Sequence, residues 1–363
     1  AASGPEPVEL CARLQRRLRG WPGAQLQHPH RPSPERARRD RLFGLLFMSR
    51  LTLERYQVWA YLIAIGLGLA VGTAWPGIGP VMETLLWPTL AALLFATFLQ
   101  VPLLHVRDAL RDRRFAGAVL LGNFVLLPLL AWALVEVFDF DPVVRLGVLL
   151  VLLVPCTDWF ITFSQLGKGD VPRAIAITPL NLVLQLILLP MYLWLMADAQ
   201  SLGSWNWATL APAVLIVLVP LAAAVLAERW MEAHPTSEGF RDTMAWWPVP
   251  LLSLVVFLIA CAQVGTVVEA IDQLQKMVPV FVLFLIAAAL LAKGIALQLR
   301  LPVEQGRTLA FSMGTRNSFV VLPLALLLPA GWEVAAVVIV VQSLVELFGM
   351  VAYVWVIPRH LFR

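Results

Sequence analysis

The stretch Val154-Pro155-Cys156-Thr157-Asp158-Trp159 interrupts the apolar run that extends from Val143 to Leu166. The proline removes one helical hydrogen bond, and a thiol, a hydroxyl and a carboxyl group follow it in the sequence, at a depth where lipid offers no hydrogen-bond partner. Polar and ionisable groups at such a depth usually face a cavity, pair with each other or contact a solute. The stretch therefore predicts a membrane helix that is broken near its middle.

A second stretch has the same character. It is Ser312-Met313-Gly314-Thr315-Arg316-Asn317-Ser318, inside the run from Thr308 to Pro329. Two interrupted helices in corresponding halves of a chain are the best sequence indication of a transporter's binding site. The two stretches together therefore favour a transporter over other membrane proteins.

The composition is that of a polytopic membrane protein. Of the 363 residues, 60% are hydrophobic and 14% are charged, whereas a soluble domain is nearer half apolar and a quarter charged. The apolar runs are continuous and do not alternate, so we expect helices rather than a barrel in the lipid bilayer. The net charge of +4 does not indicate a nucleic-acid partner, because Lys and Arg concentrate in residues 1–55 and in alternate loops.

Ten segments reach the length of about 20 apolar residues that a span needs. An even number of spans places both termini on one side, and the distribution of Lys and Arg predicts that this side is the cytoplasm, with the protein in the plasma (cell inner) membrane. The predicted spans are 57–76, 80–103, 115–137, 143–166, 172–197, 206–228, 244–266, 275–299, 307–330 and 332–357.

Ten spans divide into five plus five, which predicts an inverted repeat with span four equivalent to span nine. Aligning Thr157 with Thr315 then places Asp158 opposite Arg316 as a charge pair. Residues 51–358 form the predicted transporter domain and residues 359–363 a cytoplasmic tail. Residues 1–50 are rich in Arg and Pro, so we expect a disordered basic extension, with translation from Met48 as an alternative.

Three residues in the spans could carry chemistry. Cys156 offers a soft thiolate ligand for a thiophilic species, although a buried Cys often only fills space. Asp158 either pairs with a cation or takes up a proton during transport, because desolvation disfavours its charged form. Glu346, one helical turn after Gln342, presents the same choice. We therefore predict substrate contact for Cys156 and proton coupling for Asp158 and Glu346.

Arg316 keeps its charge, so it needs an anionic partner: Asp158, Glu346 or a negatively charged substrate. Uncharged polar residues often only join helices by hydrogen bonds, but their concentration in spans three, five and nine indicates a common polar centre. We predict that Arg316 binds substrate together with Cys156, Thr157, Asn317 and Ser318. The supporting polar residues are Asn123, Asn181 and Gln185.

Motifs for enzymatic chemistry or cofactor binding are not found. The chain has no phosphate-binding loop, HExxH motif or nucleophile elbow, so we expect no enzyme activity, no ATP-driven transport and no cofactor. Cys11, Cys156 and Cys261 lie far apart without CxxC spacing, which favours neither a disulfide framework nor a metal site.

The polar positions lie in short motifs whose order along the ten spans resembles the arsenical-resistance permease branch of the bile acid:sodium symporter superfamily. The likeness covers the chain from about Arg55 to Pro358. The motifs are Asn123-Phe124-Val125-Leu126-Leu127-Pro128, Pro155-Cys156-Thr157, Leu166-Gly167-Lys168-Gly169-Asp170, Asn181-Leu182-Val183-Leu184-Gln185, Asn317-Ser318-Phe319 and Leu344-Val345-Glu346.

The resemblance implies a core domain of spans three to five and eight to ten, in which the two broken helices cross, and a panel domain of spans one, two, six and seven. It also implies that Cys156 occupies the place of the cysteine that arsenite permeases require. The chain departs from the family at four positions. Val320 stands where a glutamate is usual, Ser318 replaces a second Asn, Arg316 precedes that motif, and Asp158 replaces a small neutral residue. These departures leave the coupling ion and the substrate open.

The leading hypothesis is a secondary transporter that exports arsenite in exchange for protons and confers arsenic resistance. The alternative is sodium-coupled uptake of an organic anion, with Arg316 attracting its carboxylate or sulfonate; a fixed cation there would however repel sodium. A third hypothesis, a membrane sensor or scaffold, rests on the basic extension alone. The sequence leaves the oligomeric state open, a homo-oligomer included.

Overall fold

The computed structural model describes residues 57–104, 111–138, 140–196, 207–234, 238–269, 271–329 and 331–363, with the backbone alone for helix residues 207–214, 238, 269 and 271–273. The predicted basic extension over residues 1–50 lies outside these residues. Leu53–Arg363 forms one compact unit. Its described part is helical and has no β-strand, which confirms the all-α class; its one isolated bridge joins two helix interruptions.

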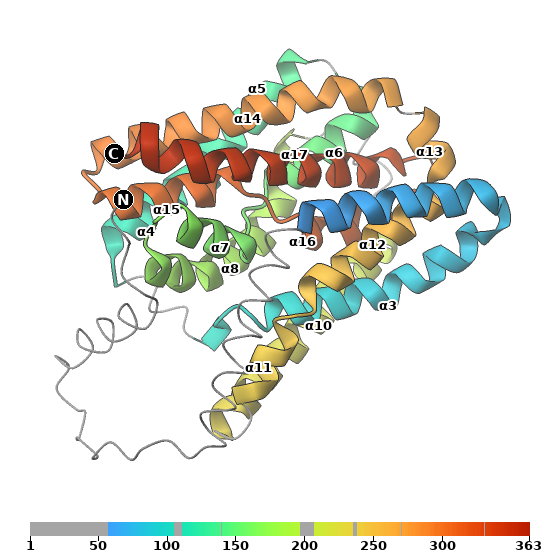
Figure 1. Ribbon diagram of the computed structural model, residues 1–363, viewed down its shortest axis with the longest axis horizontal. Helices are drawn as coiled ribbons and strands as arrows, with labels where there is room; N and C mark the ends of the chain where they lie inside the picture. Colours follow the sequence, from blue (N-terminus) through green and yellow to red (C-terminus); the bar gives the residue numbers. More distant parts are fainter. Residues whose placement is uncertain are drawn as a thin grey trace, which may run out of the picture. The chain divides into compact units, whose positions relative to one another are not determined.

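Figure 1 labels most of the helices of the described residues. In chain order they are the helix over Gln57–Ala74, η1 (Pro76–Ile78), α3 (Gly79–Phe98), α4 (Arg113–Leu121), the π-helix η3 (Gly122–Leu126), α5 (Leu127–Val137), α6 (Pro142–Leu152), α7 (Trp159–Leu166), α8 (Val171–Met196), α10 (Trp207–Ala233), α11 (Glu238–Met244), α12 (Pro248–Ala262), α13 (Val264–Glu269), α14 (Ile271–Gln298), α15 (Val303–Gly314), α16 (Ser318–Leu326), α17 (Val334–Val356) and the π-helix η5 (Ile357–Leu361).

Seven helical segments within the described residues are long and apolar enough to cross a membrane. The predicted spans 143–166 and 307–330 are not among them, because each is divided into two shorter helices. The predicted span over 206–228 is not among them either; it overlaps α10, which runs from Trp207 to Ala233. The seven candidate spans are Gln57–Ala74, Pro76–Phe98, Arg113–Val137, Val171–Met196, Gly239–Ala262, Leu274–Gln298 and Val334–Leu361.

Both predicted interruptions are present. α6 ends at Leu152, because Pro155 has no N–H and disfavours the helical conformation of the residue before it. α15 ends at Gly314, where a Cβ atom would come within 2.5 Å of the Tyr353 ring, and the next residue is extended. Each chain segment resumes as a helix, at Trp159 in α7 and at Ser318 in α16.

The four half-helices that flank the interruptions pack against α8, α14 and α17. α17 lies against α6, α14 and α16, while α14 also lies against α15, and α7 against α8. In Figure 1, α14 and α17 run side by side. α3 packs mainly against α10 and α12, and α16 contacts both α3 and α10. The second interrupted helix thus joins the two sets of helices.

The π-helix η3 orients the predicted polar residue Asn123. Pro128, the second residue of the following helix, has no N–H, so the Phe124 carbonyl four residues earlier lacks its α-helical donor. The hydroxyl of Tyr192 on α8 donates to that carbonyl at 2.6 Å. This hydrogen bond compensates for the proline and ties η3 to α8.

The chain end packs on α15. η5 continues the last helix to Leu361, beyond the predicted boundary at residue 358. Phe362 is buried, and its carbonyl accepts hydrogen bonds from Nε and Nη2 of Arg307 at 3.1 and 2.9 Å. Lys293 lies 4.6 Å above its ring. The residues predicted as a tail therefore contribute to the packing of α14 and α15.

Candidate functional site

The two interruptions are hydrogen-bonded to each other as an antiparallel bridge in which Pro155 pairs with Arg316. The Cys156 N–H donates to the Thr315 carbonyl at 3.2 Å, and the Asn317 N–H donates to the Val154 carbonyl at 2.8 Å. These bonds satisfy backbone groups that the broken helices leave unpaired. The two interrupted helices therefore meet at their breaks, which is the crossing that the family resemblance implied.

Side chains also connect the two breaks. Asn317 donates from Nδ2 to the Thr157 hydroxyl at 3.1 Å, and its Oδ1 caps α16 by accepting from the Val320 N–H at 3.4 Å. Cys156 is buried, and the backbone N–H groups of Asp158 and Phe160 at the start of α7 face its sulfur. The structure thus brings together the thiol, a hydroxyl and an amide at the beginnings of α7 and α16.

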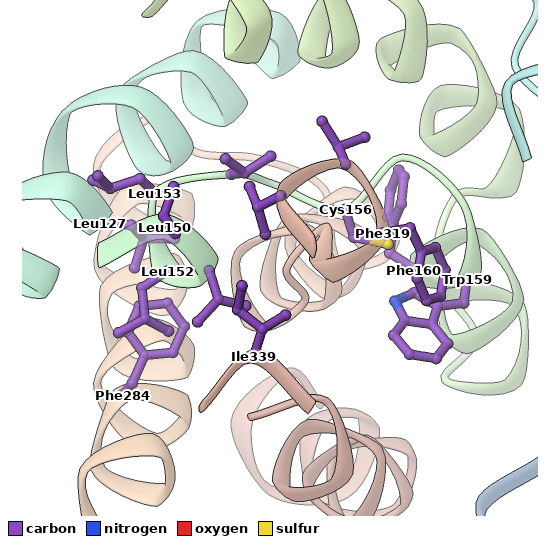
Figure 2. Packing of buried hydrophobic residues seen from close by; sticks show 14 of the residues in the cluster. Leu127, Leu150, Leu152, Leu153, Cys156, Trp159, Phe160, Phe284, Phe319 and Ile339 are labelled. Atoms are coloured by element: carbon purple, nitrogen blue, oxygen red, sulfur yellow. The ribbon is translucent and has the colours of Figure 1, made fainter. Parts of the chain in front are cut away.

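Aromatic rings lie near the thiol. Figure 2 shows Cys156 in one close view with Trp159, Phe160 and Phe319. The rings of Trp159 on α7 and Phe319 on α16 are 5.4 Å apart. The wall of the crossing is therefore apolar and aromatic, with a few polar groups.

Arg316 is fully buried, with 0% of its surface exposed. Its Nη2 donates to Asn123 Oδ1 at 2.8 Å, and Asn123 in turn donates to the Ser312 hydroxyl at 2.9 Å. The guanidinium also donates to backbone carbonyls and lies 5.5 Å from the centre of the Phe284 ring. Of its three expected partners, Glu346 is in contact, but its Oε2 accepts from the Arg316 backbone N–H at 2.8 Å.

Glu346 belongs to a chain of hydrogen bonds along α17. Gln342 donates to Glu346 Oε2 at 2.7 Å, and Ser318 donates to Gln342 Oε1 at 3.2 Å. Ser343 donates to the Ser318 hydroxyl at 2.8 Å. The network links Glu346 on α17 to the beginning of α16 beside the crossing. A change of charge at Glu346 would therefore alter the hydrogen bonds at the beginning of α16.

Three further predicted residues lie on α8 or directly before α7. Asp158 is half-buried at the start of α7 and does not cap that helix with its side chain. Asn181 and Gln185 are buried one turn apart on α8, and their side-chain polar atoms have no hydrogen-bond partner within the described part of the chain. Their predicted roles stay predictions.

Ser312, Ser343 and Tyr192 also take part in the site and were not singled out as site residues from the sequence. The Ser312 hydroxyl accepts from Asn123, which is 189 residues earlier in the chain, so no sequence spacing indicates its role. Tyr192 and Ser343 carry no sequence signal for their site contacts either, because these contacts, to Phe124 and to Ser318, are with other helices.

The comparison with protein families decides the class of the chain. The model described as Sodium Bile acid symporter family matches residues 87–270, which include Cys156 and Thr157 of the crossing. The chain belongs to the sodium bile acid symporter family. It is therefore a multi-pass membrane protein of a transporter family.

Two relatives are consistent with this family assignment. The human protein named sodium/bile acid cotransporter 4 is 26% identical over 219 residues, which are 56% of this chain and 47% of the relative. The mouse P3 protein is 26% identical over 207 residues, 56% of this chain and 42% of the relative. The chain thus spans about half the length of these relatives. The comparisons support the superfamily and do not show the arsenical-resistance branch.

Proposed function

We propose that the chain is a secondary active transporter of a small organic anion that binds where the two interrupted helices meet. The observation that carries the proposal is the antiparallel bridge between the breaks, Cys156 to Thr315 and Asn317 to Val154. Broken helices that meet inside a membrane protein form substrate sites in several transporter folds. This replaces arsenite export as the leading reading, because the named relatives include sodium/bile acid cotransporters.

The two half-helices that begin at the crossing support an anionic substrate. α7 starts at Trp159 and α16 at Ser318, so both helix N-termini, with their partial positive charge, lie beside the same polar centre. Trp159 and Phe319 would cover the apolar body of the solute, while the Thr157 hydroxyl and the Asn317 amide would bind its polar groups. An amphipathic organic anion fits this combination.

Arsenite export in exchange for protons is the second candidate. Cys156 favours it, because a buried thiol at the beginning of a helix matches a thiophilic solute. In that case Asp158 and Glu346 would carry the protons. The arsenical-resistance branch, and with it a role in arsenic resistance, depends on this candidate.

We further propose ten spans in an inverted 5+5 repeat, with the interrupted helices as spans four and nine. The core domain would hold spans three to five and eight to ten, and the panel domain the other four. Substrate would cross by rocking of the core against the panel. The helix packing supports this division, because α3, α10 and α12 form one set and α6, α14, α15 and α17 another.

The proposed location is the plasma membrane with both termini in the cytoplasm, as the distribution of Lys and Arg indicates. Fusion of a reporter that is active only in the cytoplasm, after Arg363, tests the orientation. An active C-terminal fusion is expected, and an inactive one at equal protein level would contradict it. A homo-oligomer is also proposed, and measuring the molecular mass of the purified protein tests it.

The substrate is tested in proteoliposomes that contain the purified chain. Uptake of labelled taurocholate, a bile acid conjugate, is compared with uptake of arsenite, each for the wild type and for Cys156→Ala. Taurocholate uptake above empty liposomes, reduced less than about tenfold by the substitution, supports the organic anion. Arsenite uptake that the substitution abolishes, without taurocholate uptake, supports the second candidate instead.

A further inference from the structure

The guanidinium of Arg316 is surrounded by oxygen atoms of uncharged groups. Its Nη atoms donate to Asn123 Oδ1 at 2.8 Å and to the carbonyls of Leu152, Ser312 and Met313 at 3.3, 3.1 and 2.9 Å. Leu152 is the last residue of α6, and Ser312 and Met313 lie in the last turn of α15. Two half-helices therefore direct the negative ends of their dipoles at one buried point.

This set of ligands is the kind that proteins offer to a hard cation. Such ions take backbone carbonyl and amide oxygens as ligands, and transporters bind sodium at the C-terminal ends of broken helices. The Glu346 carboxylate adds negative charge beside the point, since it accepts from the backbone N–H of Arg316 at 2.8 Å. A small monovalent cation would be stable there if the arginine were absent.

We infer that the guanidinium of Arg316 is a tethered cation that fills a cation-binding position at the crossing, so that no free sodium ion binds at that point. Arginine keeps its charge under all physiological conditions, so the position stays filled. The consequence for coupling, transport without sodium at the crossing, rests on the proposed transport function. The inference that Arg316 fills a cation position does not depend on the proposed transport function.

Thermal unfolding of the purified full chain tests the inference. The wild type, Arg316→Ala, Arg316→Lys and the control Lys293→Ala are compared in sodium chloride and in choline chloride of equal ionic strength. Lys293 is a matched control, because it is a half-buried cation on α14 away from the crossing. We expect sodium to raise the Tm of Arg316→Ala by about 3 °C or more over choline, and not that of the other three proteins.

Guanidinium chloride at low millimolar concentration serves as the second probe, because it restores the missing group itself. It should raise the Tm of Arg316→Ala as sodium does. Equal Tm values of Arg316→Ala in all three salts would overturn the inference. So would a sodium-specific rise in the wild type that the substitution does not enlarge.

Arg316→Ala could fail to fold in choline. Folded protein recovered from sodium-containing buffer alone would then support the inference, and failure in sodium and guanidinium alike would overturn it. Because the unfolding measurement needs no transported solute, it is independent of the substrate. If the chain transported no bile acid, the proposed function would be contradicted, but the effect of sodium on the Tm of Arg316→Ala would still test the inference.

Discussion

Tyr192 supplies the donor that the helix around Asn123 lacks. Its hydroxyl lies 2.6 Å from the Phe124 carbonyl, which Pro128 leaves without an α-helical partner. Tyr192→Phe removes this buried hydrogen bond, so we expect a loss of about 0.5–1.5 kcal/mol in the free energy of unfolding. Thermal unfolding of the purified chain measures it.

Pro128→Ala is the control at this site. The alanine restores a backbone N–H that can reach the Phe124 carbonyl, so Tyr192→Phe should lose less stability in the Pro128→Ala background than in the wild type. Equal losses in both backgrounds would show that the hydroxyl does not compensate for the proline.

Some residues of the candidate site could be predicted from the sequence, and others could not. Cys156, Thr157, Asn317 and Ser318 could be predicted as one group, because a proline or glycine marks each break beside them. The distant partners of Arg316 could not be derived from sequence spacing. Its guanidinium binds Asn123 and the Leu152 carbonyl, and this choice depends on how distant helices are rotated in space. Its other two partners, the carbonyls of Ser312 and Met313, are local.

At the scale of the helix, Asn317 both caps α16 and joins it to the other break. Asn317→Ala removes the acceptor for the Val320 N–H and the donor to Thr157. We expect a loss of about 1–2 kcal/mol, from the cap and the hydrogen bond together. Asn317→Asp keeps the cap acceptor and should lose less. Chemical or thermal unfolding distinguishes them, and equal losses would contradict a capping role.

The helices themselves were largely predictable, and their junctions were not. Pro155 and the polar run after Gly314 predict both interruptions, because each ends a helix for a local reason. The bridge between Pro155 and Arg316 is a contact across more than a hundred residues, so no local signal reveals it. The π-helix η3 was missed because the apolar pattern continues through it.

At the scale of the molecule, Asp112 ties together the starts of α4, α8 and α15. It accepts from the Phe115 N–H at 3.1 Å, from Arg173 Nε at 2.7 Å and from Gln305 Nε2 at 3.2 Å. Partial burial acts to raise the pKa of this carboxyl, but the hydrogen bonds from Phe115 and Arg173 and the charge of Arg173 outweigh it and lower the pKa below its usual value. The ionised form is thus favoured in the folded chain.

The pH dependence follows from that direction. A lowered pKa stabilises the fold above the unfolded value of about 3.9, and the contribution is lost as the pH falls through the folded value. Asp112→Asn should therefore lower the Tm at pH 7 and lose this effect below pH about 4. Because Arg173 is partly exposed, we expect no more than about 1 kcal/mol. A difference that is constant with pH would contradict the charge interaction.

The most direct test of the whole account is uptake of labelled taurocholate by proteoliposomes with the wild type, Thr157→Val and Thr84→Val. Thr157 lies at the crossing and bonds Asn317, whereas Thr84 is an exposed threonine of α3 whose hydroxyl donates to the Pro80 carbonyl of its own helix. We predict uptake by the wild type and Thr84→Val, and about tenfold less by Thr157→Val. Uptake no faster than in empty liposomes, or equal in all three proteins, would contradict a substrate site at the crossing.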